Sequence, residues 1–193
     1  MYLKQTVAPT YKPLSRTEVK NHLKVDVTND DTLIDDLISA AVEFVEDYTG
    51  LQLMPATWVL YLDDFASVTY LNKAPVQTFV DVKYYDTDGT LQTLDSAYYD
   101  PDMVSEPARI REAYGYSWPT AYEKMNAVMM TFWCGFSASN DSEDAQQAAV
   151  PADIKQAMLL FIQHNYDNRG DEGHRKLPQA IYDLLDKKRL FWL

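Results

Sequence analysis

One segment, NDDTLIDDLISAAVEFVEDYTG at residues 29–50, most constrains the fold because it carries every signal of a single bounded helix. Asn29 or Asp30 can cap its start, and Gly50 can adopt the left-handed conformation that closes the last turn. Apolar residues recur at helical spacing, at Leu33, Leu37, Ala41, Phe44 and Tyr48, with Ile34, Ile38 and Val45 beside them. The pattern predicts an amphipathic helix that must bury one face against other elements.

The rest of this helix is acidic. The segment holds seven carboxylates and no base. Its outer face is expected to present Asp35, Asp36, Glu43, Glu46 and Asp47. A solvated surface is the ordinary interpretation of such a face, and a cation site or an acidic functional surface are the alternatives.

Helical patterns flank a block of alternating patterns. A capping box at Ser15–Glu18 opens a short helix, Pro151 starts a second strong helix, and a terminal helix follows Pro178. Strands are expected at 58–63, 68–71, 76–85, 90–94, 98–100, 109–110 and 127–133, and a surface loop or linker at 136–150. We predict one α+β domain over 1–193, with a helical core from 15–50 and 151–193 and an antiparallel β-rich insertion at 55–135.

Charge is unevenly distributed along the 193 residues, whose net charge is −12. Residues 1–24 hold five bases and one acid, residues 169–193 hold six bases and four acids, and the residues between them hold six bases and 24 acids, so the middle carries all of the excess acid. Sequence-specific nucleic-acid binding is therefore not expected, because the phosphate attraction that dominates such binding is missing. We expect a soluble protein made in the cytoplasm, without a leader or a membrane span.

Signatures of catalysis are missing from the sequence. There is no glycine-rich phosphate loop, nucleophile elbow or metal-binding histidine pair. His22, His164 and His174 belong to separate helical regions, and the single cysteine, Cys134, lies among apolar residues typical of a core. Asp86, Asp88 and Gly89 resemble the start of a calcium loop but lack its final glutamate, so a hairpin turn is favoured. We predict no catalytic residue, cofactor or metal site.

Two groups of apolar residues lack an obvious core. Tyr114, Tyr116 and Trp118 lie in a segment that is neither a clear helix nor a clear strand, so packing under a loop, a subunit interface and a sugar-stacking surface all stay open. The C-terminal segment joins apolar and basic residues, namely Leu184, Leu185, Lys187, Lys188, Arg189, Phe191, Trp192 and Leu193. It predicts either a docking surface or a helix folded back on its own core.

The order of these motifs resembles the phage gp6-like head–tail connector (adaptor) family, also described as DNA-packaging proteins. The resemblance rests on VKNHLKVD from Val19, the acidic helix from Asp30, TWVLYLDDF from Thr57, the APVQTFVDVKYYDTDGTLQTL hairpin from Ala74, ARI at Ala108, WP at Trp118, MTFWCGF and the helix beginning VPADIKQ at Val150. Such proteins are structural and form a ring of roughly twelve copies under the portal of the virion neck. The ring extends the DNA channel and docks the next neck or tail protein.

Two surfaces are expected to serve this role. We expect the C-terminal segment to contact the portal, because it combines apolar anchors with basic charge on an acidic protein, and the acidic face, from Asp35 to Asp47, to line the channel or meet a neighbouring subunit. An acidic wall would repel DNA and let it slide without sequence-specific binding. A neck stopper or tail-completion protein is the alternative within virions, and a carbohydrate-binding or hydrolytic domain would require two carboxylates facing one cleft.

Overall fold

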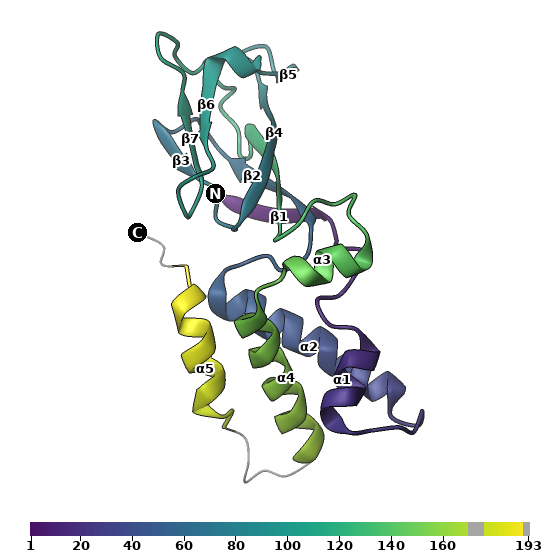
Figure 1. The fold of residues 1–193 in the computed structure, drawn as a ribbon. Helices are drawn as coiled ribbons and strands as arrows, with labels where there is room; N and C mark the ends of the chain where they lie inside the picture. The colour runs from purple at the N-terminus through teal and green to yellow at the C-terminus, as the bar shows by residue number, and fades with distance from the viewer. Residues whose placement is uncertain (170–175, 191–193) are drawn as a thin grey trace.

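Helices gather at one end of the molecule, and strands form an elongated lobe at the other (Figure 1). The computed structural model describes residues 1–169 and 176–190. The helices are α1 (Arg16–Leu23), α2 (Asp31–Thr49), α3 (Glu143–Ala149), α4 (Ala152–Asp167) and α5 (Gln179–Leu185), with short 3-10 helices η1 (Ser96–Tyr98) and η3 (Asp186–Lys188). The strands are β1 (Tyr2–Val7), β2 (Ala56–Leu62), β3 (Val68–Tyr70), β4 (Val76–Tyr85), β5 (Leu91–Thr93), β6 (Tyr99–Asp102), β7 (Arg109–Glu112) and β8 (Val128–Cys134). The predicted α+β class, with a bundle of N- and C-terminal helices and an antiparallel β-rich lobe, is confirmed.

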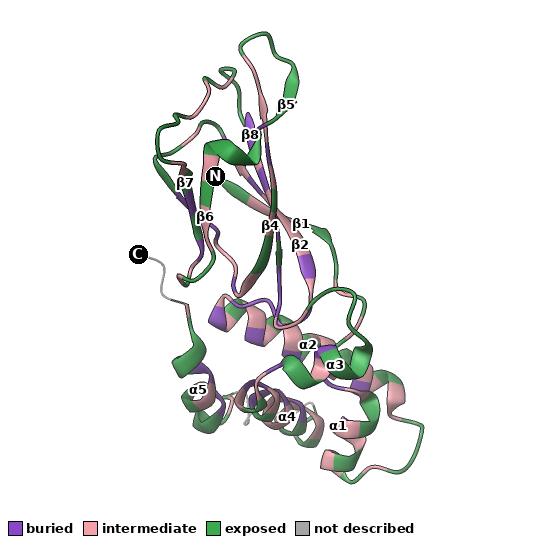
Figure 2. Cartoon of the chain, turned by 45° about the horizontal axis from the view of Figure 1, so that its top comes forward, coloured by how far each residue is buried: buried purple, intermediate pink, exposed green. Residues whose placement is uncertain are grey.

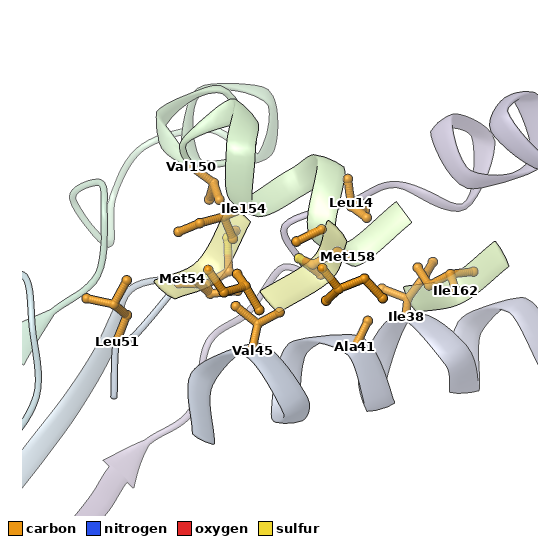
Figure 3. Close-up of a cluster of buried hydrophobic side chains, with 14 of the residues drawn as sticks. Leu14, Ile38, Ala41, Val45, Leu51, Met54, Val150, Ile154, Met158 and Ile162 are labelled. Atoms are coloured by element: carbon orange, nitrogen blue, oxygen red, sulfur yellow. The ribbon is translucent and has the colours of Figure 1, made fainter. Parts of the chain in front are cut away.

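The helical bundle has one apolar core shared by α2, α4 and α5. On α2 the buried apolar residues are Ile34, Ile38, Ala41 and Val45, and they meet Ile154, Met158 and Ile162 of α4 (Figure 3). The expected stripe was therefore shifted by one position, because Leu37, Phe44 and Tyr48 lie at its half-buried edge and Leu33 lies outside the cluster. Phe44 stacks on Phe161 at that edge, with ring centroids 5.0 Å apart.

The helix ends follow local rules in most places. The Ser15 hydroxyl accepts a hydrogen bond from the Glu18 amide, and Gly50 ends α2 with φ +77°. Two details differ from expectation. Asp30 occupies the cap position of α2 but its carboxylate accepts from the Tyr166 hydroxyl instead, and Pro151 precedes the first residue of α4. The local sequence assigns the Asp30 side chain to capping, but this side chain makes a long-range contact with α4 instead.

Two antiparallel sheets face each other across a second core. The larger sheet has the order β1-β2-β8-β4-β5 and the smaller one β3-β7-β6. Leu60, Val82 and Phe132 of the first sheet pack with Ile110 of the second, and all four are fully buried. Figure 2 shows buried residues on β2 and β8, inside the lobe, and exposed residues on the outlying strands.

One edge strand of the larger sheet comes from the N-terminus. β1 pairs with β2, with Tyr2 opposite Tyr61 and Val7 opposite Thr57. The sheet is therefore not built from the predicted insertion at 55–135 alone, and the sequence did not predict a strand at 2–7. The apolar alternation in this short segment is weak, and only pairing with β2 makes it a strand.

Three other local predictions concern the turn at Asp86, the packing of Trp118 and the 136–150 segment. The Asp86 carboxylate accepts hydrogen bonds from the amides of Asp88 and Thr90, which confirms a hairpin turn there. Trp118 stacks on Phe65 with centroids 4.8 Å apart, so it packs under a loop. The prediction of a surface loop or linker at 136–150 is wrong in part, because α3 forms within this segment. The Ser142 hydroxyl caps the start of α3.

Candidate assembly surfaces

The predicted acidic face is narrower in the structure than in the sequence. Asp36, Glu43 and Asp47 are exposed on one side of α2, at the spacing that aligns residues along a helix. Asp35 and Glu46 are half-buried and bound by other groups of the same chain. The acidic surface therefore consists of Asp36, Glu43 and Asp47, and we call these three residues the acidic stripe.

Bases of α1 neutralise the carboxylates at the start of α2. Arg16 makes a bidentate ion pair with Asp35, and Lys20 Nζ lies 2.6 Å from Asp31 Oδ1. These hydrogen bonds lower the pKa of both carboxyl groups, Asp35 through Arg16 and Asp31 through Lys20. The Asp35 carboxylate thus joins α1 to α2 and is not a free acidic group.

Glu46 holds the junction between the bundle and the β lobe. Its Oε1 accepts hydrogen bonds from the Leu53 amide at 2.9 Å and from Gln52 Nε2 at 2.8 Å. Gln52 in turn accepts from the indole of Trp58 at the start of β2. Burial raises the pKa of the Glu46 carboxyl. The Glu46 side chain is therefore a structural acceptor inside one subunit, and we leave it out of the acidic surface.

The C-terminal segment folds back on the bundle as far as it is described. Leu185 is fully buried and Leu184 packs against the same core, so neither is available as an exposed portal anchor. The Leu190 amide donates to the Thr49 carbonyl at 2.8 Å, which holds the segment against the end of α2. Phe191, Trp192 and Leu193 lie outside the described residues.

Three exposed bases remain from the predicted portal surface, and we call Lys187, Lys188 and Arg189 the basic triplet. Lys188 Nζ lies 3.7 Å from Asp153, and the Arg189 guanidinium lies 5.1 Å from the ring centroid of Tyr48. The triplet lines a groove with Glu106, Phe136 and Leu190, between the bundle and the lobe. This groove combines three bases and one acid with the apolar side chains of Leu51, Phe136 and Leu190.

The cysteine and the histidines were the residues considered for catalysis, and the structure shows what surrounds those that it describes. Cys134 is buried in the lobe core, and burial raises the pKa of its thiol. His22 Nε2 lies 3.1 Å from Gln163 Oε1, His164 is half-buried on α4, and His174 falls outside the described residues. Within residues 1–169 and 176–190, no cluster of histidine, cysteine and acidic residues could hold a metal ion. None of the described helices is long and apolar enough to span a membrane.

The β lobe exposes apolar and aromatic side chains, of which Trp133 and Val104 were not singled out from the sequence. Trp133 is 42% exposed on the outer face of β8, and Val104 is 96% exposed in the β6–β7 connection. Tyr114 is fully exposed, whereas Tyr116 packs beside Tyr98 with ring centroids 4.7 Å apart. Trp133 looks like a core residue in the sequence because its strand is apolar apart from Thr131. Only the pairing register shows that it points away from the second sheet.

Comparisons with known proteins point to one family. Residues 17–90 match the family model of the phage gp6-like head–tail connector protein. This segment runs from α1 to the turn after β4. No curated protein matches the chain.

Solved structures of gene transfer agent (GTA) particles contain chains similar to this one over its whole length. A chain in the neck of the empty GTA particle, computed with C6 symmetry, is 26% identical with a TM-score of 0.78. A chain in the neck of the native GTA particle, computed with C12 symmetry, is 25% identical with a TM-score of 0.75. Each match covers 100% of this chain and 97% of the other. A chain in the native GTA virion, at 24% identity and a TM-score of 0.77, shows the same fold. The resemblance to head–tail connector proteins, predicted from the sequence, is confirmed.

Proposed function

We propose that this chain, a gp6-like head–tail connector protein by its residues 17–90, is a structural adaptor in the neck of a virion. Copies form a ring of roughly twelve under the portal, extend the DNA channel and dock a stopper or tail-completion protein. The observation that carries the proposal is the match along the whole chain to a component of a neck computed with C12 symmetry. The role is architectural and needs no catalytic residue or cofactor.

The acidic stripe suits the wall of a DNA channel. Asp36, Glu43 and Asp47 are exposed along one side of α2, and no ion pair occupies them among the described residues. Repeated around a ring, such a stripe would present a negative surface that DNA phosphates avoid. We therefore assign the stripe to the lumen, where DNA passes without sequence-specific binding.

Charge reversal tests this assignment. Changing Asp36, Glu43 and Asp47 together to Lys should leave rings and particles intact but slow genome ejection, because basic walls bind the duplex. A matched triple reversal at the exposed Asp26, Asp88 and Glu123, outside α2, should leave ejection unchanged. Equal ejection rates in both variants would remove the stripe from the channel.

The basic triplet suits the portal contact. It stands at the end of the bundle, on a protein whose net charge is −12, and can steer an acidic partner surface. Changing Lys187, Lys188 and Arg189 together to Glu should weaken co-sedimentation with the portal and flatten its salt dependence. Deleting Phe191–Leu193 should abolish binding while circular dichroism stays unchanged. Portal binding that survives both changes would move the contact elsewhere.

Electron microscopy of assembled necks tests the adaptor role itself. The expected density is a closed ring of this chain between the portal and the next neck component. A single copy plugging the channel, or a position at the tail tube, would identify a stopper or a tail-completion protein and refute the adaptor role. Purified protein mixed with portal rings provides the same test in isolation, since a template can drive a monomer into a ring.

A further inference from the structure

Strand β1 is attached to the rest of its subunit mainly through β2. It forms one edge of the larger sheet and pairs with no other strand. The register runs from Tyr2 opposite Tyr61 to Val7 opposite Thr57. Tyr2 is 63% exposed and Val7 is 58% exposed, and Leu3 is the apolar side chain of β1 that packs against the lobe core. The attachment is therefore mostly a backbone ladder to a single neighbouring strand.

A short hinge without hydrogen bonds follows β1. Ala8, Pro9 and Thr10 make no hydrogen bond with any other described residue. Hollows of about 190 Å³ and about 420 Å³ lie against this segment, and Ala8 lines both of them. Pro9 holds Ala8 in extended conformations, whereas the chain bends at Thr10 and Tyr11. A change of direction at residues 8–10 therefore breaks no hydrogen bond of the subunit.

The chain is fixed again directly after this hinge. Lys12 Nζ donates to Ser39 Oγ at 2.8 Å and to the Asp35 carbonyl at 3.1 Å, and Gln147 Nε2 donates to the Lys12 carbonyl at 3.0 Å. Leu14 is fully buried in the bundle core. Figure 1 shows this stretch leading from β1 at the edge of the lobe to α1 in the bundle. Strand β1 is thus an arm on a hinge, and the base of the arm stays in its own bundle.

We propose that in the ring β1 of each copy leaves its own sheet and pairs with β2 of the next copy. This exchange rests on the proposed ring and assigns a specific contact to it. The register is the one that β1 and β2 have within the subunit, so the exchanged arm makes the same backbone hydrogen bonds and needs no new complementary surface. Extended, the three hinge residues span about 10 Å and the six strand residues about 20 Å, so the arm reaches a subunit directly beside its own.

The exchange also accounts for a protein that assembles on a template. In a free subunit the arm is at high effective concentration beside its own β2, so the closed form is favoured. On a portal ring, neighbouring copies are held side by side, and the arm of one copy competes for β2 of the next. The contact is heterologous and repeats around the ring. An open chain of exchanged copies would leave one β2 edge without a strand, so closure of the ring is favoured.

A disulfide between β1 and β2 tests the exchange. Lys4 and Val59 are register partners, and the Cα separation of such cross-strand pairs, about 4.5–5.5 Å, allows a disulfide. The Lys4→Cys, Val59→Cys variant is assembled on portal rings under reducing conditions and then oxidised with diamide. The assembled rings should give a covalent ladder of oligomers on a non-reducing gel, whereas the free protein should give cross-linked monomer. The native Cys134 is buried and should not interfere.

Locking the arm gives an independent readout. The same variant, oxidised as a free monomer before mixing with portal rings, should form rings about tenfold less well by sedimentation and electron microscopy, and dithiothreitol should restore assembly. The matched control is Val59→Cys, Thr131→Cys, which joins register partners on β2 and β8 of the same sheet. Neither of these strands exchanges, so the oxidised control should assemble as well as the unchanged protein. Circular dichroism confirms that each oxidised monomer is folded.

Two results would overturn the exchange and leave the adaptor role intact. One is that assembled rings of the Lys4→Cys, Val59→Cys variant give only cross-linked monomer on oxidation. The other is that the variant locked before mixing forms rings as well as its control. Failure of the unchanged protein to form any ring in a neck would overturn both the exchange and the adaptor role.

Discussion

Glu46 offers the sharpest test of how the two halves of the molecule are joined. One carboxylate oxygen accepts hydrogen bonds from the Leu53 amide and from Gln52 Nε2, and both Gln52 and Leu53 are fully buried. Glu46→Ala removes the acceptor from two donors. An unsatisfied buried donor costs about 1–3 kcal/mol, so we expect a loss of about 2–6 kcal/mol of unfolding free energy. For a chain of this length each kcal/mol lowers Tm by about 2–4 °C.

Glu46→Gln is the matched variant. The amide oxygen of Gln can accept from Leu53 and Gln52, while the partly desolvated charge is gone. At neutral pH the variant should therefore be at least as stable as the unchanged protein. Urea unfolding followed by circular dichroism gives both free energies. An alanine variant within about 0.5 kcal/mol of the glutamine variant would refute the role of this acceptor, since surface changes lie in that range.

The pH dependence has a definite sign. Burial raises the pKa of Glu46 above its ordinary value of 4.5, so the native state keeps a proton that the unfolded state has released. The contribution of Glu46 to stability is thus greatest below pH 4.5 and falls as the pH rises through the native pKa. The advantage of Glu46→Gln over the unchanged protein should grow from pH 4 to pH 7. A constant difference over this range would contradict the raised pKa.

Three further predictions concern the two cores and the turn between them. Ile38→Ala should lower the free energy of unfolding in urea by about 2–5 kcal/mol and Leu33→Ala by under about 1 kcal/mol, because only Ile38 is fully buried in the bundle. Equal losses would instead place Leu33 in the core, as the sequence predicts. Gly135→Ala should cost about 1–3 kcal/mol by thermal melting, since Gly135 has φ +140° and a Cβ would lie 2.8 Å from the Pro55 backbone; an unchanged Tm would argue against this close approach. Cys134 should react with a thiol reagent only after unfolding, because burial raises its pKa, and fast labelling of the native protein would show an open lobe.

Local sequence rules determined the elements and the fold class. Gly50 ends α2 because a residue without Cβ adopts a positive φ freely, and Asp86 closes the hairpin because its carboxylate reaches the next amides. Helical periodicity placed α2 and α4 correctly, since a buried face leaves a repeating mark over many residues. The order of such motifs along the chain also carried the resemblance to head–tail connectors.

Tertiary structure alone decided which polar and apolar residues are free. Asp35 and Glu46 carry the same sequence signal as Asp36 and Glu43, yet Arg16 and the Leu53 amide bind the first two. Residues 2–7 become a strand only because β2 offers an unpaired edge. Partners distant along the chain set these outcomes, and a local pattern holds no record of them. The same reason separates Leu185, buried in the core of the bundle, from Val104 and Trp133, which are exposed.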